Sequence, residues 1–347
     1  MKKFINSVLF AFLSLLLFNC GGGGGTSINY NSGPSSSGGT FLDDNNAATY
    51  NSTTASNHQA YDSYENVKGT VQSSHQNPFD IINAYKAYGY GFSGDGKRIA
   101  ILDGAFDTDH YIYTDKTVDT YGTLTADSSS SYHGNSVAGV ASGYLNTSYS
   151  GSVVSHGVAY DADLHLSSVV QKGGETYYAT HWANATSDAT ASGTVVQNNS
   201  WGVDEQYNPS SSYSTSTLAT MWTNEGYTSN ASSVQSYLDA LNTFQSTGVI
   251  VYALSNTSSF GNADVQAALP EIDSNLAEAW ITGVNIDVTG SAGNESYSIK
   301  SAPCGATAEY CLGADGWYIG GAAYYAGGSS YYSTGGLTGT SFVAPQI

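Results

Sequence analysis

From about residue 98 onward, apolar residues of this 347-residue chain gather in short runs separated by stretches of helical periodicity. The runs have the length of strands buried on both faces, and they span residues 98–102, 164–170, 194–199 and 249–254. Helical spacing follows His133 and fills 233–247, which Gly248 ends, and Asp80 is placed to cap an earlier short helix. Alternating strands and helices predict an α/β fold with a mostly parallel sheet flanked by helices.

The first residues have the pattern of an export signal. Lys2 and Lys3 precede an apolar run that is too short to span a bilayer, so residues 1–19 are predicted to be a secretory signal. Leu17-Phe18-Asn19-Cys20 resembles a bacterial lipobox, in which the cysteine is lipidated and becomes the first residue of the mature chain. Asn19 departs from the small residue usual at that position, so an ordinary cleaved signal is the alternative.

Residues 20–77 are rich in Gly, Ser and Asn and contain few large apolar side chains. Such a segment cannot bury a core, so it is interpreted as a flexible tether between a membrane anchor at Cys20 and a folded domain at 78–347. A pro-segment is the other interpretation, but it would need a periodic apolar pattern that is not visible here.

Composition limits which classes of binding partner and which cellular compartment are expected for this chain. The chain has 9 Lys and Arg against 28 Asp and Glu, a net charge of −19, and therefore no basic surface for nucleic acid. Only 11% of residues are charged, while 40 are Gly and 28 are Tyr, which is typical of an exported surface protein. Together with the lipobox-like segment, this predicts a location in the bacterial cell envelope, lipid-anchored at the outer membrane or cell surface, with release as a secreted passenger as the alternative.

The remaining cysteines form a close pair in a chain bound for an oxidising compartment. Cys304 and Cys311 are therefore expected to form a small disulfide loop. Two thiols without a histidine at ligand spacing do not make a zinc site, so no metal is expected there.

Polar side chains follow three of the predicted strands. Asp103 directly follows the first run, Ser200 to Gly202 follow the third, and Asn256 follows the fourth. In parallel sheets the chemistry collects at the carboxyl ends of strands. Taken alone, Asp103 would be better interpreted as a cap or turn residue.

Three sequence blocks favour a catalytic role for Asp103 instead. They are Ala100-Ile101-Leu102-Asp103-Gly104, His133-Gly134-Asn135-Ser136-Val137-Ala138-Gly139 and Gly339-Thr340-Ser341-Phe342-Val343-Ala344-Pro345. In the order Asp, His, Ser, they resemble the signature blocks of the subtilisin-like serine proteases, and the resemblance runs from about Pro78 to the last residue. It implies a three-layer subtilisin-like fold and an endopeptidase that acts on protein or peptide substrates.

The resemblance also assigns roles to residues. Ser341 would be the nucleophile, His133 its general base, and Asp103 the group that orients His133. Asn256 would donate to the oxyanion together with the backbone N–H of Ser341, which is expected at a helix start. Ser200, Trp201 and Gly202 would form an open edge that pairs with extended substrate.

Some positions depart from the family pattern. Asn135 and Ser136 stand where Thr-His is frequent, and Ser255 replaces the usual Gly before Asn256. Asn262 therefore competes as the oxyanion donor, and Asp107 competes with Asp103. His110 is interpreted as structural.

Other expectations concern the rest of the chain. Residues 203–232 are predicted to be inserted loops. No cofactor is expected, although calcium is common in the family and no ligand loop is recognisable. The chain stops soon after Ser341 for this family, which suggests a longer protein similar to the autotransporter proteases. The alternative function is an inactive binding or adhesion protein on a protease-like scaffold, and a polysaccharide hydrolase is disfavoured because paired catalytic carboxylates are not evident.

Overall fold

A computed structural model describes residues 78–84, 87, 92–124, 132–144, 156–170, 176–291, 294–316, 319–325 and 329–347. All of them belong to one compact unit, Ser36–Ile347. The predicted signal at 1–19, Cys20 and the predicted tether at 20–77 lie outside the described residues. Within the described part of the chain, no helix is long and apolar enough to cross a membrane.

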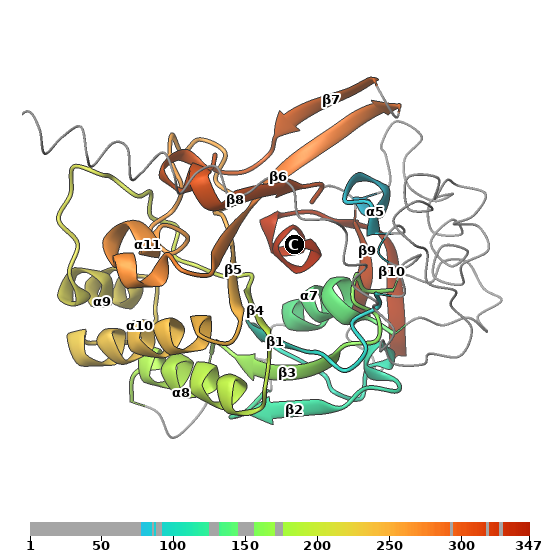
Figure 1. The fold of residues 1–347 in the computed structure, drawn as a ribbon, viewed down its shortest axis with the longest axis horizontal. Helices are drawn as coiled ribbons and strands as arrows, with labels where there is room; N and C mark the ends of the chain where they lie inside the picture. The colour runs from blue at the N-terminus through green and yellow to red at the C-terminus, as the bar shows by residue number, and fades with distance from the viewer. Residues whose placement is uncertain are drawn as a thin grey trace, which may run out of the picture. The chain divides into compact units, whose positions relative to one another are not determined.

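A mostly parallel sheet forms the centre of the unit (Figure 1). Its strands are β1 (Arg98–Asp103), β2 (Val118–Tyr121), β3 (Asp163–Ser168), β4 (Val196–Asn199), β5 (Val249–Ala253), β6 (Trp280–Ser291), β7 (Asn294–Ile299) and β8 (Cys311–Ala314). They run in the order β2-β3-β1-β4-β5-β6-β7, with β8 also on β6. Only β7 pairs antiparallel, and a separate antiparallel pair contains β9 (Ile319–Tyr325) and β10 (Ser329–Leu337).

The helices that accompany these strands differ in length. They are α5 (Pro78–Ile81), α7 (His133–Ser142), α8 (Tyr178–Ala191), α9 (Thr215–Asn224), α10 (Ala231–Gln245) and α11 (Leu269–Ile272). Asp80 was expected to precede a short helix, but it lies inside α5, and residues 85, 86 and 88–89 of the predicted segment lie outside the described residues.

Successive side chains of the central strands β1 and β5 pack in different clusters of buried residues. In β1, Ala100 and Leu102 pack in the cluster that contains the buried residues of α8 and α10, whereas Ile101 packs with those of α7. In β5, Ile250 belongs to the first cluster and Val251 to a small cluster with Ala344. Because successive strand residues point to opposite faces, helices cover both faces of the sheet, and the predicted three layers are confirmed (Figure 1).

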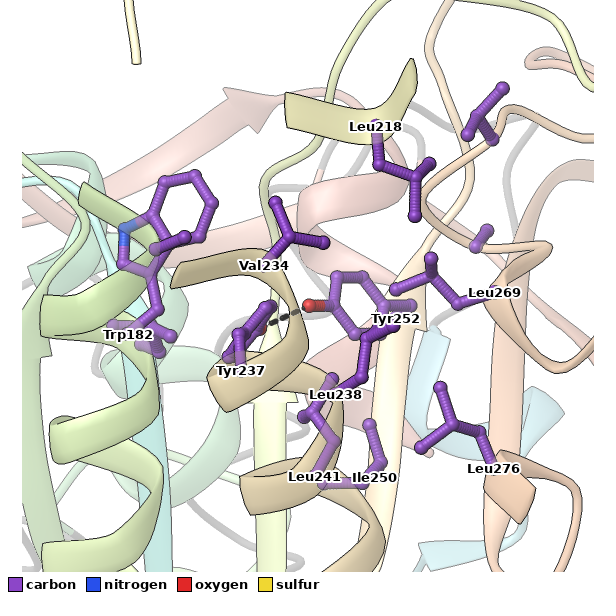
Figure 2. Packing of buried hydrophobic residues seen from close by; sticks show 14 of the residues in the cluster. Trp182, Leu218, Val234, Tyr237, Leu238, Leu241, Ile250, Tyr252, Leu269 and Leu276 are labelled. Carbon is purple, nitrogen blue, oxygen red and sulfur yellow. Dashed lines mark hydrogen bonds between the residues drawn. The ribbon is translucent and has the colours of Figure 1, made fainter. Parts of the chain in front are cut away.

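The larger core lies between the sheet and the pair α8 and α10 (Figure 2). Tyr237 of α10 and Tyr252 of β5 are fully buried, and their hydroxyl groups hydrogen-bond at 2.5 Å. The bond satisfies two polar groups that would otherwise be costly inside an apolar core. Trp182 of α8 lies in the same core and donates from its indole to the carbonyl of Val169.

Residues 203–232, which were predicted to be inserted loops, are not loop throughout. They contain α9, which begins with a capping box formed by Ser214 and Thr217. Leu218 and Trp222 of this helix are buried in the larger core. The many Ser and Thr residues hid the amphipathic pattern, because they cap and flank α9 without interrupting its buried side.

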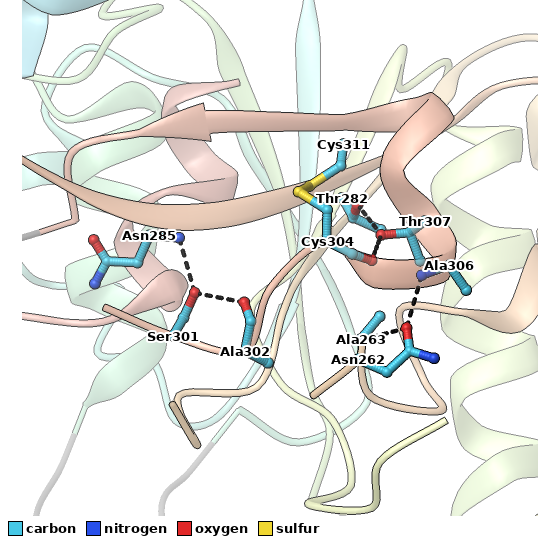
Figure 3. The surroundings of a disulfide bond; sticks show 10 residues. All are labelled: Asn262, Ala263, Thr282, Asn285, Ser301, Ala302, Cys304, Ala306, Thr307 and Cys311. Atoms are coloured by element: carbon cyan, nitrogen blue, oxygen red, sulfur yellow. Dashed lines mark hydrogen bonds between the residues drawn. A yellow bond between two sulfur atoms is a disulfide. The ribbon is translucent and has the colours of Figure 1, made fainter. Parts of the chain in front are cut away.

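The predicted disulfide joins Cys304 and Cys311 (Figure 3). It closes a short loop that includes a 3₁₀ turn, Gly305–Tyr310, immediately before β8. The loop is also tied to the body of the unit, because Ala306 donates its N–H to Oδ1 of Asn262 (Figure 3).

Candidate active site

Three neighbouring strands bring the predicted site residues to one edge of the sheet. β1 pairs with β4 and β4 pairs with β5, all in parallel. Asp103 is the last residue of β1, Ser200 follows β4, and Asn256 follows β5 after a short turn. The carboxyl ends of these three strands lie at the same edge of the sheet, where the functional site of an α/β fold is expected.

Asp103 and His133 are in direct contact. Asp103 is fully buried, and its Oδ1 lies 2.5 Å from Nδ1 of His133, the first residue of α7. The N–H of Gly104 donates to the same oxygen at 2.6 Å. A carboxylate only accepts hydrogen bonds, so Nδ1 of His133 carries the proton and Nε2 of the neutral ring keeps its lone pair.

The surroundings of His133 combine charge and packing. The negative charge of Asp103 raises the pKa of His133 above its usual 6.5, against the opposing effect of burial. The ring of Phe342 packs against the imidazole, with 5.8 Å between the ring centroids. Since Phe342 follows Ser341, this contact brings the third predicted residue to the same place.

Ser341 lies in a 3₁₀ turn, Thr340–Phe342, and is 8% exposed. Its Oγ donates to the carbonyl of Ser200 at 3.2 Å, and Oγ of Ser200 donates back to the carbonyl of Ser341 at 2.9 Å. Among the described residues, no hydrogen bond joins Ser341 to His133. Where the start of an α-helix was expected, the structure has this three-residue turn, which is followed by a second 3₁₀ turn, Ala344–Gln346.

Asn256 is oriented by the residue before the serine. Its Oδ1 accepts hydrogen bonds from the N–H of Thr340 at 2.9 Å and from Oγ1 of Thr340 at 3.0 Å. A backbone N–H can only donate, so the amide oxygen must face Thr340. Both N–H groups of Nδ2 are left without a partner in the described part of the chain, which is what an oxyanion donor requires.

The competing candidates occupy other places. Asn262 is held at both ends of its amide, because Oδ1 accepts from Ala263 and Ala306 while Nδ2 donates to the carbonyl of Tyr207. Asp107 accepts the N–H of Asp109 and has no contact with His133. The geometry therefore favours Asn256 and Asp103.

Ser255 does not strain the loop that leads to Asn256. Its φ is not among the positive values of the described chain, so a glycine is not required at this position. Instead, its N–H donates to Oδ2 of Asp264 and its Oγ donates to Oδ1 of Asp204, both at 2.7 Å. Of these two contacts, the one from Oγ to Asp204 depends on the serine side chain, since a glycine would supply the same backbone N–H.

The segment Ser200–Gly202 presents an open backbone. No described residue bonds to the N–H or C=O groups of Trp201 and Gly202, and Gly202 is exposed. Together with Asn256 and Ser341, this segment lines a pocket of about 290 Å³. Unpaired backbone beside a pocket can add an extended peptide as a further strand.

No group of three or more His, Cys, Asp or Glu residues within the described ranges is arranged to hold a metal ion. His110, which was interpreted as structural, accepts the N–H of Ile112 at the start of a 3₁₀ turn.

Sequence reasoning did not single out several residues that shape this site. Thr340 orients Asn256, Phe342 packs on His133, and Asp204 and Asp264 line the pocket. Thr340 and Phe342 lie inside the recognised serine block, so their position was a usable signal. Nothing in the local sequence marks the two aspartates as neighbours.

Comparisons with known proteins show the family of this chain. The model of the subtilase family matches residues 54–347, and the chain therefore belongs to that family. It is a subtilisin-like serine peptidase. No curated protein sequence matches the chain.

Solved structures share the fold at low sequence identity. The prenylagaramide maturation protease PagA matches with a TM-score of 0.50 and 18% identity over 76% of each chain. Fervidolysin from Fervidobacterium pennivorans, a keratinolytic enzyme related to subtilisin, matches with a TM-score of 0.50 and 20% identity over 74% of this chain. The match spans 35% of the fervidolysin chain.

Proposed function

We propose that this chain is an endopeptidase that cleaves extracellular or cell-surface proteins through Asp103, His133 and Ser341. The observation that carries the proposal is the 2.5 Å contact between Nδ1 of His133 and Oδ1 of Asp103, beside the turn that holds Ser341. A buried carboxylate on one ring nitrogen leaves the other nitrogen as a base, which a serine nucleophile requires.

In the proposed reaction, Oγ of Ser341 attacks the substrate carbonyl while Nε2 of His133 takes its proton. Asp103 stabilises the imidazolium that forms. His133 then gives the proton to the leaving amine, and the acyl group stays on Ser341 until water, activated by His133, releases it. The hydroxyl of Ser341 must turn from Ser200 toward His133 for the first step, and such contacts commonly tighten only when substrate is bound.

The negative charge that develops on the carbonyl oxygen is assigned to two donors, Nδ2 of Asn256 and the backbone N–H of Ser341. Asn256 is suited to this role because Thr340 holds its carboxamide in place before substrate arrives. A donor that is already oriented costs no reorganisation in the transition state. The open backbone of Trp201 and Gly202 would align the peptide on the same side.

One observation favours the alternative of a binding protein on a protease-like scaffold. The Ser341 hydroxyl is bonded to a carbonyl oxygen and not to the imidazole. In a protein that only binds, this arrangement would persist and the hydroxyl would stay unreactive.

Labelling with a fluorophosphonate serine probe separates the two functions. We expect the full chain to be labelled, the Ser341→Ala variant to be unlabelled, and the exposed-site control Ser210→Ala to be labelled as the parent is. Absence of labelling in a folded protein would support the binding scaffold. Labelling that survives Ser341→Ala would assign the nucleophile to another residue.

We further propose that the chain is exported and lipid-anchored at Cys20. The support is the charged start, the short apolar run and the lipobox-like end of residues 1–20. Metabolic labelling with an alkyne fatty acid should mark the parent chain and not Cys20→Ser. Equal labelling of both would contradict the anchor, and absence of labelling with normal signal cleavage would favour the ordinary signal.

A further inference from the structure

The pocket beside Ser341 is lined mainly by two chain segments, with Asp264, Thr340 and Ser341 as further lining residues. Residues 200–204, which follow β4, form one wall, and residues 253–257, at the end of β5, form the other. Its volume of about 290 Å³ is at the lower limit of the roughly 300–1,000 Å³ typical of small-molecule sites. A pocket of this size next to the reacting serine is suited to a single substrate side chain.

The charge of the pocket is one-sided. Asp204 and Asp264 both line it, and none of its lining residues is Lys, Arg or His. The two acidic segments are held against each other, since Gln206 and Asp264 form an antiparallel bridge and the N–H of Val265 donates to the carbonyl of Glu205. The carboxylates are therefore fixed on a rigid wall.

Asp264 is 2% exposed, yet its carboxylate lies close to the open edge of the pocket. A methyl group placed on Gly202 would be 3.7 Å from Oδ1 of Asp264. Because Gly202 has no side chain, nothing on that residue stands between the pocket and this oxygen. Oδ1 accepts the N–H of Ala267 and Oδ2 accepts that of Ser255, and burial raises the pKa of this carboxyl group to about 6 against the opposing effect of its backbone hydrogen bonds.

Asp204 is the exposed partner. Its Oδ1 accepts the hydroxyl groups of Ser255 and Thr257, at 2.7 and 2.8 Å, so the carboxylate bridges the two walls of the pocket. No described residue donates to its Oδ2. One carboxylate oxygen at the mouth thus remains available to a ligand.

We infer that this pocket selects a basic side chain, lysine or arginine, on the residue that supplies the reacting carbonyl. The inference rests on the proposed peptidase function, because it takes the substrate carbonyl to lie at Ser341 and Asn256. A long cationic side chain entering the pocket would place its charged end between Asp264 and Asp204. Its methylene groups would remain against the walls formed by Trp201 and Leu254.

The physical reason is that no Lys, Arg or His side chain among the described residues forms a salt bridge with Asp204 or Asp264. A lysine or arginine side chain supplies the missing donors and makes charge-assisted hydrogen bonds. A neutral side chain of the same length would desolvate the carboxylates without pairing them, and an acidic one would add repulsion. The pocket would therefore select basic side chains both by attracting cations and by disfavouring neutral and acidic side chains.

The test uses peptidyl aminomethylcoumarin substrates, which contain only the acyl side of the scissile bond. The last residue is lysine, arginine, norleucine or glutamate in an otherwise constant peptide, and kcat/KM is measured with the full chain. Norleucine is the matched control, since it keeps most of the lysine side-chain length without the charge. We expect lysine or arginine to exceed norleucine by at least about tenfold, with glutamate the poorest.

Two variants test whether the preference for lysine over norleucine arises at Asp204. Asp204→Asn should reduce the lysine-to-norleucine ratio by about tenfold, while Asp239→Asn, an exposed site on α10, should leave it unchanged. Asp204 is the primary variant because Asp264 is buried and Asp264→Asn could unfold the chain. The fluorophosphonate probe is applied in parallel. Labelling with equal kcat/KM for lysine and norleucine, or an unchanged ratio in Asp204→Asn, would overturn the basic preference alone, whereas absence of labelling in a folded chain would overturn the peptidase function itself.

Discussion

At the scale of single residues, the two asparagines near the site are expected to differ in role, Asn256 acting in catalysis and Asn262 in stability. Asn256 has a free amide nitrogen beside Ser341, whereas both ends of the Asn262 amide are bonded. Asn256→Ala should therefore lower kcat by about 10²- to 10³-fold with little change in KM.

Asn262→Ala should act in the opposite way. It removes the acceptor of two backbone N–H groups and should lower the free energy of unfolding by about 1–3 kcal/mol while the remaining folded enzyme keeps its kcat. Thermal unfolding and steady-state kinetics of both variants provide the check. A loss of turnover confined to Asn262→Ala would move the oxyanion donor to that residue.

The pH response of His133 follows from its neighbour. The charge of Asp103 raises the pKa of His133, so the folded state binds this proton more tightly than the unfolded chain does. The stability that His133 contributes is then present below the unfolded pKa of about 6.5 and is lost as pH rises through the folded value. Activity runs the other way, because the base must be neutral, and kcat/KM should rise with a midpoint above about 6.5.

Asp103→Asn tests this coupling directly. With the charge gone, the His133 pKa should fall, as measured by NMR of the ring protons in the Ser341→Ala background. An unchanged His133 pKa would show that burial and not Asp103 governs the proton.

How much of the site the sequence could predict depends on how local the signal is. Asp103, His133 and Ser341 lie inside blocks whose neighbours specify them, and Asp103 and His133 meet as expected. The pocket aspartates could not be found in the same way. Asp204 and Asp264 are 60 residues apart, the difference of their numbers, and they become neighbours only through pairing of the segments around Gln206 and Asp264.

At the scale of elements, strands and helices with strong apolar periodicity were the predictable part. β1, β4, β5, α7 and α10 all appear within a few residues of the expected ranges. The region beyond β5 was not assigned, although Val284 to Thr289 of β6 alternate apolar and polar residues, which was a usable strand signal. β7 and β8 are short and show little such alternation. Their strand structure comes from pairing with β6, which local pattern does not report.

The disulfide loop offers a prediction at the same scale. Replacing both Cys304 and Cys311 by serine should lower the free energy of unfolding by about 2–3 kcal/mol, because an eight-residue closed loop restricts the unfolded chain. Urea unfolding of the double variant, compared with the parent under oxidising and reducing conditions, measures the effect. A reduced parent should match the variant, and a stability that does not respond to reductant would contradict the assignment.

At the scale of the whole molecule, the net charge of −19 acts on substrates before they reach the pocket. A strongly negative surface raises the local concentration of cations, and salt screens this effect over a Debye length of about 10 Å at 0.1 M. The carboxylates inside the pocket are in contact with the bound side chain and are screened much less. Added salt should therefore weaken the long-range attraction of cationic substrates, whereas the selection of a side chain in the pocket should change little.

This separation gives the last prediction. Raising salt from about 20 to about 200 mM should lower kcat/KM for the lysine substrate several-fold and leave the norleucine substrate nearly unchanged. Asp204→Asn should lose most of its lysine preference at every salt concentration yet keep the salt dependence, because it removes one charge of nineteen. If the variant instead lost the salt dependence along with the preference, the field at the pocket and not that of the whole chain would attract the substrate. A lysine preference that vanished completely at high salt in the parent would mean that the pocket itself does not select.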